Sequence, residues 1–182
     1  DQLSNHHASH RLAPHVSLQR QLLRWRSRMR HRRSLTLAQI KRREGRMLLQ
    51  QRALNKYHSA GLWTNACCSH PAPGEATADA AHRRLQEELG FSTGLEKIFD
   101  FTYQTAFDNG LIEHEFDHVF AGKYEQRITP NPEEVKDVCY KSLEDIQQSL
   151  QTHPQKYTSW FHIAFPKVKE WAVQQGLVQP TI

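Results

Sequence analysis

An amphipathic helix followed by a long β-hairpin constrains the fold of this 182-residue chain most strongly. Residues 76–89 carry one apolar stripe at spacings of three and four, made of Ala78, Ala81, Leu85 and Leu89. Gly90 follows where a helix C-cap is expected. Helical and strand-like segments alternate along the rest of the chain, so the pattern predicts a single α/β domain.

The hairpin is predicted over residues 99–121. Phe99, Phe101 and Tyr103 alternate with polar residues, and Asp108-Asn109-Gly110 is a strong turn signal. The return strand has one face with Glu113, Glu115, Asp117 and Val119 and another with Ile112, Phe116 and Phe120. A three-residue loop with Gly110 left-handed would pair Phe107 with Leu111. It would place Tyr103 opposite Glu115, whereas a two-residue loop would put these two on opposite faces.

Other elements have weaker patterns. We expect strands at residues 47–52 and 135–140, a loop over residues 53–74 and a weak helix at residues 143–150. A last helix is expected at residues 160–175, where the apolar side chains recur at helical spacing: Phe161, Phe165, Val168, Trp171 and Ala172.

Charge divides the chain at residue 46. Residues 1–46 hold 12 of the 24 Lys and Arg residues and only two acidic ones, a net charge of +10, whereas residues 47–182 have a net charge of −5. The first segment is expected to be a basic, poorly packed extension. An RNA- or membrane-binding arm is the alternative, but Trp25 is its only aromatic residue, so base stacking has little support.

The number of cysteines and the hydropathy of the chain indicate in which cellular compartment it is expected. Cys67, Cys68 and Cys139 are odd in number and two are adjacent, which disfavours a disulfide framework. The sequence has no apolar window long enough for a transmembrane helix and no signal pattern at its start. We therefore expect a cytoplasmic protein in a reducing compartment, with no membrane or nucleic-acid partner.

One motif concerns phosphate chemistry. It consists of Glu75, a gap of seven residues, and the stretch RRLQEELGF at residues 83–91. This motif resembles the Nudix box. Ser69 stands where that box has its first Gly, and Arg84 stands where it has a magnesium-binding Glu. The resemblance implies a mixed β-sheet sandwiched between helices. An arginine at the Glu position suits holding a diphosphate rather than hydrolysing it.

Two flanking motifs narrow the family. Residues 52–75 (RALNKYHSAGLWTNACCSHPAPGE) and residues 112–120 (IEHEFDHVF) resemble type 1 isopentenyl diphosphate isomerases, and the resemblance runs from Met47 to the C-terminus. It implies conversion of isopentenyl diphosphate to dimethylallyl diphosphate through a carbocation. A Nudix hydrolase of a nucleoside diphosphate derivative is the alternative function, and a non-catalytic phosphate- or RNA-binding module is another.

The resemblance also implies residue roles. The catalytic residues would be Cys68 and Glu115, which move the protons, and Tyr103, which assists Glu115; this agrees with the need for two titratable groups around an alkene. Ligands for Mn²⁺, Mg²⁺ or Zn²⁺ would be His70, Glu113 and Glu115, while Glu88 would contact a Mg²⁺ carried by the diphosphate. The substrate would be held by Arg52, Lys56, Arg84 and Trp160. The implied partner is a small isoprenoid diphosphate, bound by a monomer or a homodimer.

Residues 1–46 do not match that family, which has two further histidine ligands and an aromatic strand there. No two histidines in this segment are seven residues apart, and arginines occupy the place of the strand. Two interpretations stay open. The segment has diverged, with His15 or His31 as a replacement ligand, or it is non-native translation from a shifted frame upstream of Met47, which would leave His70, Glu113 and Glu115 as an open metal site.

Overall fold

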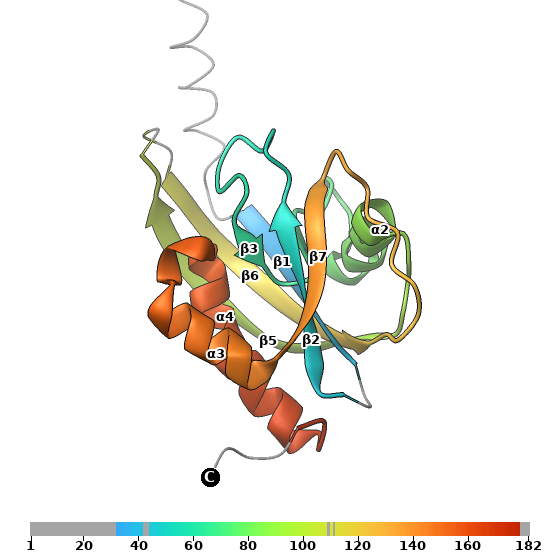
Figure 1. Ribbon diagram of the computed structural model, residues 1–182. Helices are drawn as coiled ribbons and strands as arrows, with labels where there is room; N and C mark the ends of the chain where they lie inside the picture. The colour runs from blue at the N-terminus through green and yellow to red at the C-terminus, as the bar shows by residue number, and fades with distance from the viewer. Residues whose placement is uncertain (1–31, 42–43, 109, 111, 179–182) are drawn as a thin grey trace, which may run out of the picture. The chain divides into compact units, whose positions relative to one another are not determined.

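A mixed β-sheet forms the centre of the protein in a computed structural model that describes residues 32–41, 44–108, 110 and 112–178 (Figure 1). Its strands are β1 Arg32–Lys41, β2 Arg46–Arg52, β3 Trp63–Thr64, β4 Cys67–Ser69, β5 Leu95–Ala106, β6 Ile112–Lys123 and β7 Val135–Ser142. The order is β3-β2-β1-β6-β5, with β4 paired to β1 and β7 paired to β2. The β1–β6 pair is parallel and the other strand pairs are antiparallel, which confirms the mixed sheet.

Helices cover both faces of this sheet (Figure 1). Helix α2, Thr77–Leu89, packs on one face, where Leu85 and Leu89 join Leu35 and Leu37 of β1 in a buried cluster. Helices α3, Leu143–Thr152, and α4, Ser159–Gln174, belong to the cluster on the other face, with the short 3₁₀ helix Pro154–Lys156 between them. The predicted sandwich of a sheet between helices is confirmed.

The apolar stripe of α2 starts later than its period indicates. Ala78 is exposed, whereas Ala80, Ala81, Leu85 and Leu89 are buried. Periodicity defines the face of a helix but not how far along the helix the sheet reaches, so the prediction for Ala78 was wrong. The predicted C-cap is confirmed, because Gly90 is left-handed with φ +74° and its N–H donates to the Gln86 carbonyl at 3.0 Å.

Strand β1 overturns the prediction that the basic segment lacks a core strand. Arg32–Lys41 lies between β6 on one side and β2 and β4 on the other. Leu35 and Leu37 are 0% exposed, and so are Ala38 and Ile40. The arginines flank a stretch in which apolar and polar residues alternate. This stretch is stabilised by pairing with strands that are distant in sequence, so local composition did not predict it. The described part of the sheet therefore includes residues before Met47. His15, His31 and the rest of the predicted basic arm before residue 32 lie outside the described residues.

The loop predicted over residues 53–74 contains two short strands, β3 and β4, so that prediction was wrong in part. Strands of two and three residues are too short to show a period, and they form because β2 and β1 offer hydrogen-bonding partners. Strand β4 carries Cys67 and Cys68, so its pairing with β1 determines the direction of both thiols.

The hairpin has the predicted register. Tyr103 pairs with Glu115 and Ala106 pairs with Ile112. Gly110 has φ +78°, and its N–H donates to the Phe107 carbonyl at 2.9 Å. The predicted pairing of Phe107 with Leu111 lies outside the described residues.

Candidate active site

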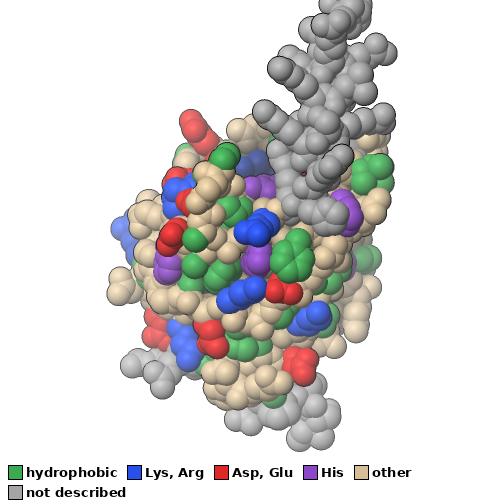
Figure 2. Space-filling view, turned by 180° about the vertical axis from the view of Figure 1, so that it is seen from behind, with side chains coloured by type: hydrophobic (Ala, Val, Ile, Leu, Met, Phe, Trp, Pro, Cys, Tyr) green, Lys and Arg blue, Asp and Glu red, His purple; other side chains and the backbone are tan. Residues whose placement is uncertain are grey.

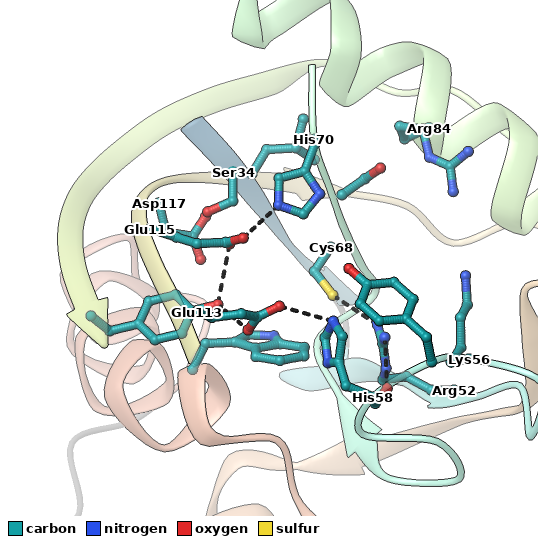
Figure 3. Close-up of a pocket in the computed structure, with 15 residues that line it drawn as sticks. Ser34, Arg52, Lys56, His58, Cys68, His70, Arg84, Glu113, Glu115 and Asp117 are labelled. Carbon is teal, nitrogen blue, oxygen red and sulfur yellow. Dashed lines mark hydrogen bonds and ion pairs between the residues drawn. The ribbon is translucent and has the colours of Figure 1, made fainter. Parts of the chain in front are cut away.

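A pocket of about 550 Å³, partly open to solvent, collects nine of the ten side chains singled out from the sequence (Figure 3). They are Arg52, Lys56, Cys68, His70, Arg84, Tyr103, Glu113, Glu115 and Trp160. The tenth, Glu88, is buried behind this lining, where it accepts hydrogen bonds from Gln50 Nε2 at 2.9 Å and from Arg84 Nη2 at 2.7 Å. Residues from distant parts of the sequence thus lie together in one pocket.

The two adjacent cysteines face opposite sides of the sheet, as alternation along β4 requires. Cys67 is 0% exposed and packs in the cluster beneath α2, while Cys68 lines the pocket. The Arg52 guanidinium lies 3.5 Å from the Cys68 sulfur. Burial raises the pKa of Cys68 to about 12, so its thiol is protonated at neutral pH.

Tyr103 lies between two glutamates of β6. Its hydroxyl is 3.2 Å from Glu113 Oε2 and 3.2 Å from Glu115 Oε2, and all three side chains are buried. Burial and the two carboxylates raise the pKa of Tyr103, so the phenol keeps its proton and can donate a hydrogen bond.

Each of these glutamates also contacts a histidine (Figure 3). His70 Nε2 lies 2.6 Å from Glu115 Oε1, and His58 Nε2 lies 2.8 Å from Glu113 Oε1. Burial would raise the pKa of Glu115, but the hydrogen bond and charge of His70 outweigh it and the pKa falls below its usual range. The carboxylate of Glu115 is therefore ionised.

The two glutamates predicted as metal ligands contact different histidines. Of the two glutamates, Glu115 contacts His70 and Glu113 contacts His58. In the described part of the chain, no three His, Cys, Asp or Glu side chains converge closely enough to hold a metal ion as they stand.

The donor atoms nevertheless suit a divalent cation. Asp117 lies on the same face of β6, is 2% exposed, and accepts a hydrogen bond from Thr36 on its Oδ2 at 2.7 Å. Its Oδ1 is buried, and the buried Ser34 hydroxyl lies close enough to Asp117 and Glu115 to lower the pKa of both. Burial raises the pKa of Asp117 to about 7. Carboxylate and hydroxyl oxygens beside an imidazole form a set that divalent ions accept.

Cationic side chains line another part of the pocket. Lys56 pairs with Glu134, and the guanidinium of Arg84 contacts Glu87 Oε2 at 2.6 Å and Glu134 Oε2 at 3.4 Å. Glu134 therefore bridges Lys56 and Arg84. Together with Arg52, the side chains of Lys56 and Arg84 can bind a polyanion.

Trp160 supplies an aromatic wall. It is 3% exposed, its ring lies 5.4 Å from the Arg52 guanidinium carbon, and its centroid lies 6.3 Å from that of Tyr103. Its indole N–H is buried without a hydrogen-bond partner among the described residues. The pocket thus combines an aromatic surface with acid–base groups and cations.

Sequence reasoning gave no site role to five polar residues of the lining: Ser34, Tyr57, His58, Ser69 and Asp117. Asp117 was placed on the right face of β6 but received no role. A lone histidine in a loop such as His58 has no periodic signal, and Ser34 belongs to the strand that was not predicted.

The surface carries both signs of charge. Figure 2 shows Lys and Arg, Asp and Glu, and His side chains interspersed with hydrophobic ones on the face opposite that of Figure 1. In the described ranges, no helix is both long and apolar enough to cross a membrane.

Comparison with known proteins gives the family. Residues 30–161 match the NUDIX domain. The isopentenyl-diphosphate Delta-isomerase of Pectobacterium atrosepticum is 49% identical over 125 residues, which cover 69% of this chain and 70% of that protein. That of Serratia proteamaculans is 50% identical over 118 residues, 65% of this chain and 66% of that protein. The chain thus aligns with about two thirds of the length of these relatives.

Solved structures agree on the fold. The MutT protein from Methanosarcina mazei Go1 has a TM-score of 0.63 at 19% identity, covering 77% of this chain and 94% of that one. A MutT NUDIX hydrolase from Burkholderia pseudomallei has a TM-score of 0.56 at 21% identity, covering 76% and 98%. The solved structures give only the fold, whereas the sequence relatives give the family. This chain belongs to the isopentenyl-diphosphate Delta-isomerase family of the NUDIX superfamily.

Proposed function

We propose that this pocket isomerises isopentenyl diphosphate to dimethylallyl diphosphate, a step of isoprenoid biosynthesis, with Cys68 and Glu115 as its proton-transfer pair. One observation carries the proposal: a protonated thiol and an ionised carboxylate, 47 positions apart in the sequence, line the same pocket. An alkene isomerase needs one group that gives a proton and another that takes one.

The reaction balances with these two groups alone. One adds a proton to an alkene carbon and so forms a tertiary carbocation. The other removes a proton from the carbon on the far side of the cation, and the double bond forms there. Starting from a thiol and a carboxylate, the pair ends as a thiolate and a carboxylic acid, and proton exchange with water restores it. The carbon skeleton and the diphosphate are unchanged.

The aromatic and basic side chains support the two ends of the substrate. The rings of Trp160 and Tyr103 can stabilise a carbocation by about 1–2 kcal/mol each in a dry site. Lys56, Arg84 and Arg52 would hold the diphosphate. Tyr103 would keep Glu115 oriented through its hydroxyl.

Members of this family use divalent metal ions. We propose that Glu88 contacts a Mg²⁺ bound to the diphosphate, and that His70, Glu113 and Glu115 hold Mn²⁺, Mg²⁺ or Zn²⁺. When bound, such an ion offsets the charge of the carboxylates and polarises the groups that it contacts.

The test is incubation with isopentenyl diphosphate and Mg²⁺ in heavy water. We expect dimethylallyl diphosphate that contains deuterium. Cys68→Ala and Glu115→Gln should abolish deuterium uptake, while Cys67→Ala, which changes the other side of the sheet, should keep it. Full uptake in Cys68→Ala would refute the assigned pair.

The alternative, hydrolysis of a nucleoside diphosphate derivative, predicts phosphate release in the same incubation with such a substrate. Arg84 at the position of the box glutamate disfavours it. In the structure Arg84 forms an ion pair with Glu88 at 2.7 Å, so this box position contributes a cation and not a metal-binding carboxylate.

A further inference from the structure

His58 lies inside the pocket but has no part in the proton transfer proposed above. Its Nε2 is 2.8 Å from Glu113 Oε1, and the two side chains are only 6% and 8% exposed. A buried carboxylate that loses such a partner must find another hydrogen-bond donor, because leaving it unpaired is costly. The position of Glu113 therefore depends on His58.

The backbone around His58 is held in an uncommon conformation. Arg52 Nη2 donates to the His58 carbonyl at 3.2 Å, and His58 Nδ1 lies 3.3 Å from the Ser59 hydroxyl. Ser59 itself has φ +50°, in the left-handed region that non-glycine residues seldom occupy. Such backbone persists where surrounding contacts determine it, and it is frequent at functional sites.

The imidazole ring is packed by aromatic neighbours on several sides. The ring centroids of Tyr57, Phe107 and Trp160 lie 4.4, 4.9 and 6.1 Å from that of His58. These contacts leave the ring little freedom, so Nε2 points at Glu113 as a fixed donor (Figure 3).

Glu113 competes with Glu115 for one donor. The Tyr103 hydroxyl is 3.2 Å from an oxygen of each glutamate, but a phenol has a single proton to donate. His58 Nε2 contacts Oε1 of Glu113, whereas the Tyr103 hydroxyl lies near Oε2, so His58 fixes the Glu113 carboxylate by its other oxygen. Without His58, the Glu113 carboxylate could turn toward the phenol and compete more strongly with Glu115 for its single proton.

We infer that His58 is a positioning residue of the isomerase: it fixes Oε1 of Glu113 and so limits how strongly Glu113 competes with Glu115 for the Tyr103 hydroxyl. The inference rests on the proposed function. It assigns no proton transfer to His58, which acts through Glu113 alone.

Two variants separate the hydrogen bond of His58 from its ring. His58→Phe keeps an aromatic ring among its neighbours but has no donor, while His58→Gln keeps an N–H donor near the place of Nε2 but has no ring. We expect kcat to fall about 10- to 100-fold in His58→Phe. KM should stay unchanged, because the diphosphate is held by other residues. His58→Gln should restore most of kcat.

A double variant tests the route through Glu113. If His58 acts on this residue, adding His58→Phe to Glu113→Gln should cost little beyond Glu113→Gln alone. Fully additive losses would overturn the inference. So would a His58→Gln variant as impaired as His58→Phe, since the ring and not the hydrogen bond would then be what matters.

A binding measurement separates this inference from the proposed function. Titration calorimetry with Mn²⁺ alone should show affinity about tenfold weaker in His58→Phe than in wild type and near wild type in His58→Gln. If the wild-type chain fails to isomerise the substrate, the proposed function falls, and Mn²⁺ affinity still decides the role of His58. Wild-type behaviour of His58→Phe in both measurements, or a wild-type chain that neither isomerises nor binds Mn²⁺, overturns the inference.

Discussion

Tyr103 and Glu115 are directly opposite each other in the β5–β6 hairpin, and the phenol oxygen of the first lies 3.2 Å from a carboxylate oxygen of the second. The turn at the tip determines this relationship, since Ala106 already pairs with Ile112 there. A slip of one residue would move Glu115 to the other face of the sheet. Turn chemistry therefore controls the geometry of the proposed acid–base site.

Tyr103→Phe should lower kcat about 10- to 100-fold, because a hydrogen bond to a charged group is worth about 1.5–3 kcal/mol. The ring stays, so packing against Trp160 is kept and the variant should remain folded at the assay temperature, although its thermal midpoint should fall through the lost hydrogen bond. Steady-state kinetics and a melting curve check both statements. An unchanged kcat would mean that the phenol does not assist Glu115.

Arg84→Gln should raise KM for isopentenyl diphosphate about tenfold or more, since it removes a cation from the pocket. Stability should fall too, because buried Glu88 loses its ion-pair partner. KM is therefore measured at a temperature where the variant is folded.

Arg83→Gln is the matched control. Arg83 is the neighbour of Arg84 on α2, but it pairs with Glu75 at 2.7 Å and Glu87 at 3.1 Å and does not line the pocket. KM in this variant should remain near that of wild type. Equal rises in both variants would show a general effect of helix charge and not a contact to the diphosphate.

Local signals explain which parts of the site were predictable. The turn at Gly110 and the alternation along β6 are both short-range patterns, so they gave the register of Tyr103 and Glu115 and the face shared by Glu113 and Asp117. The roles of Cys68 and His70 came from the resemblance to a family, and the structure brings both into the pocket.

The unpredicted parts depend on contacts between distant segments. Strand β1 is stable because β6 pairs along it, and no local pattern shows that partner. The same strand places Ser34 in the pocket. His58 gained a role only when the fold brought it to Glu113, 55 positions later in the sequence.

Asp117 should make stability depend on pH. Burial raises its folded pKa from 3.8 to about 7, so between these values the folded state binds more protons than the unfolded state. Its contribution to stability is complete below pH 4 and is lost as pH rises to 7. In metal-free buffer, wild type should lose on the order of 2 kcal/mol more than Asp117→Asn between pH 5 and pH 8. Urea denaturation at both pH values measures this difference. Equal losses of stability in the two proteins would show that the pKa of Asp117 is not raised.

Leu37→Ala tests whether β1 is a core strand. Leu37 is 0% exposed and packs between the sheet and α2, so the substitution should lower the free energy of unfolding by about 3–5 kcal/mol. Leu54→Ala, at a leucine that is 68% exposed, is the control and should change it by less than about 0.5 kcal/mol. Denaturant unfolding of both variants gives the comparison. If Leu37→Ala were as mild as Leu54→Ala, residues 32–41 would not pair with β6 in solution, and the basic segment would be separate from the sheet after all. A large loss would instead establish that this arginine-flanked stretch is native core, because a segment of non-native translation has no reason to fill the place between β2 and β6.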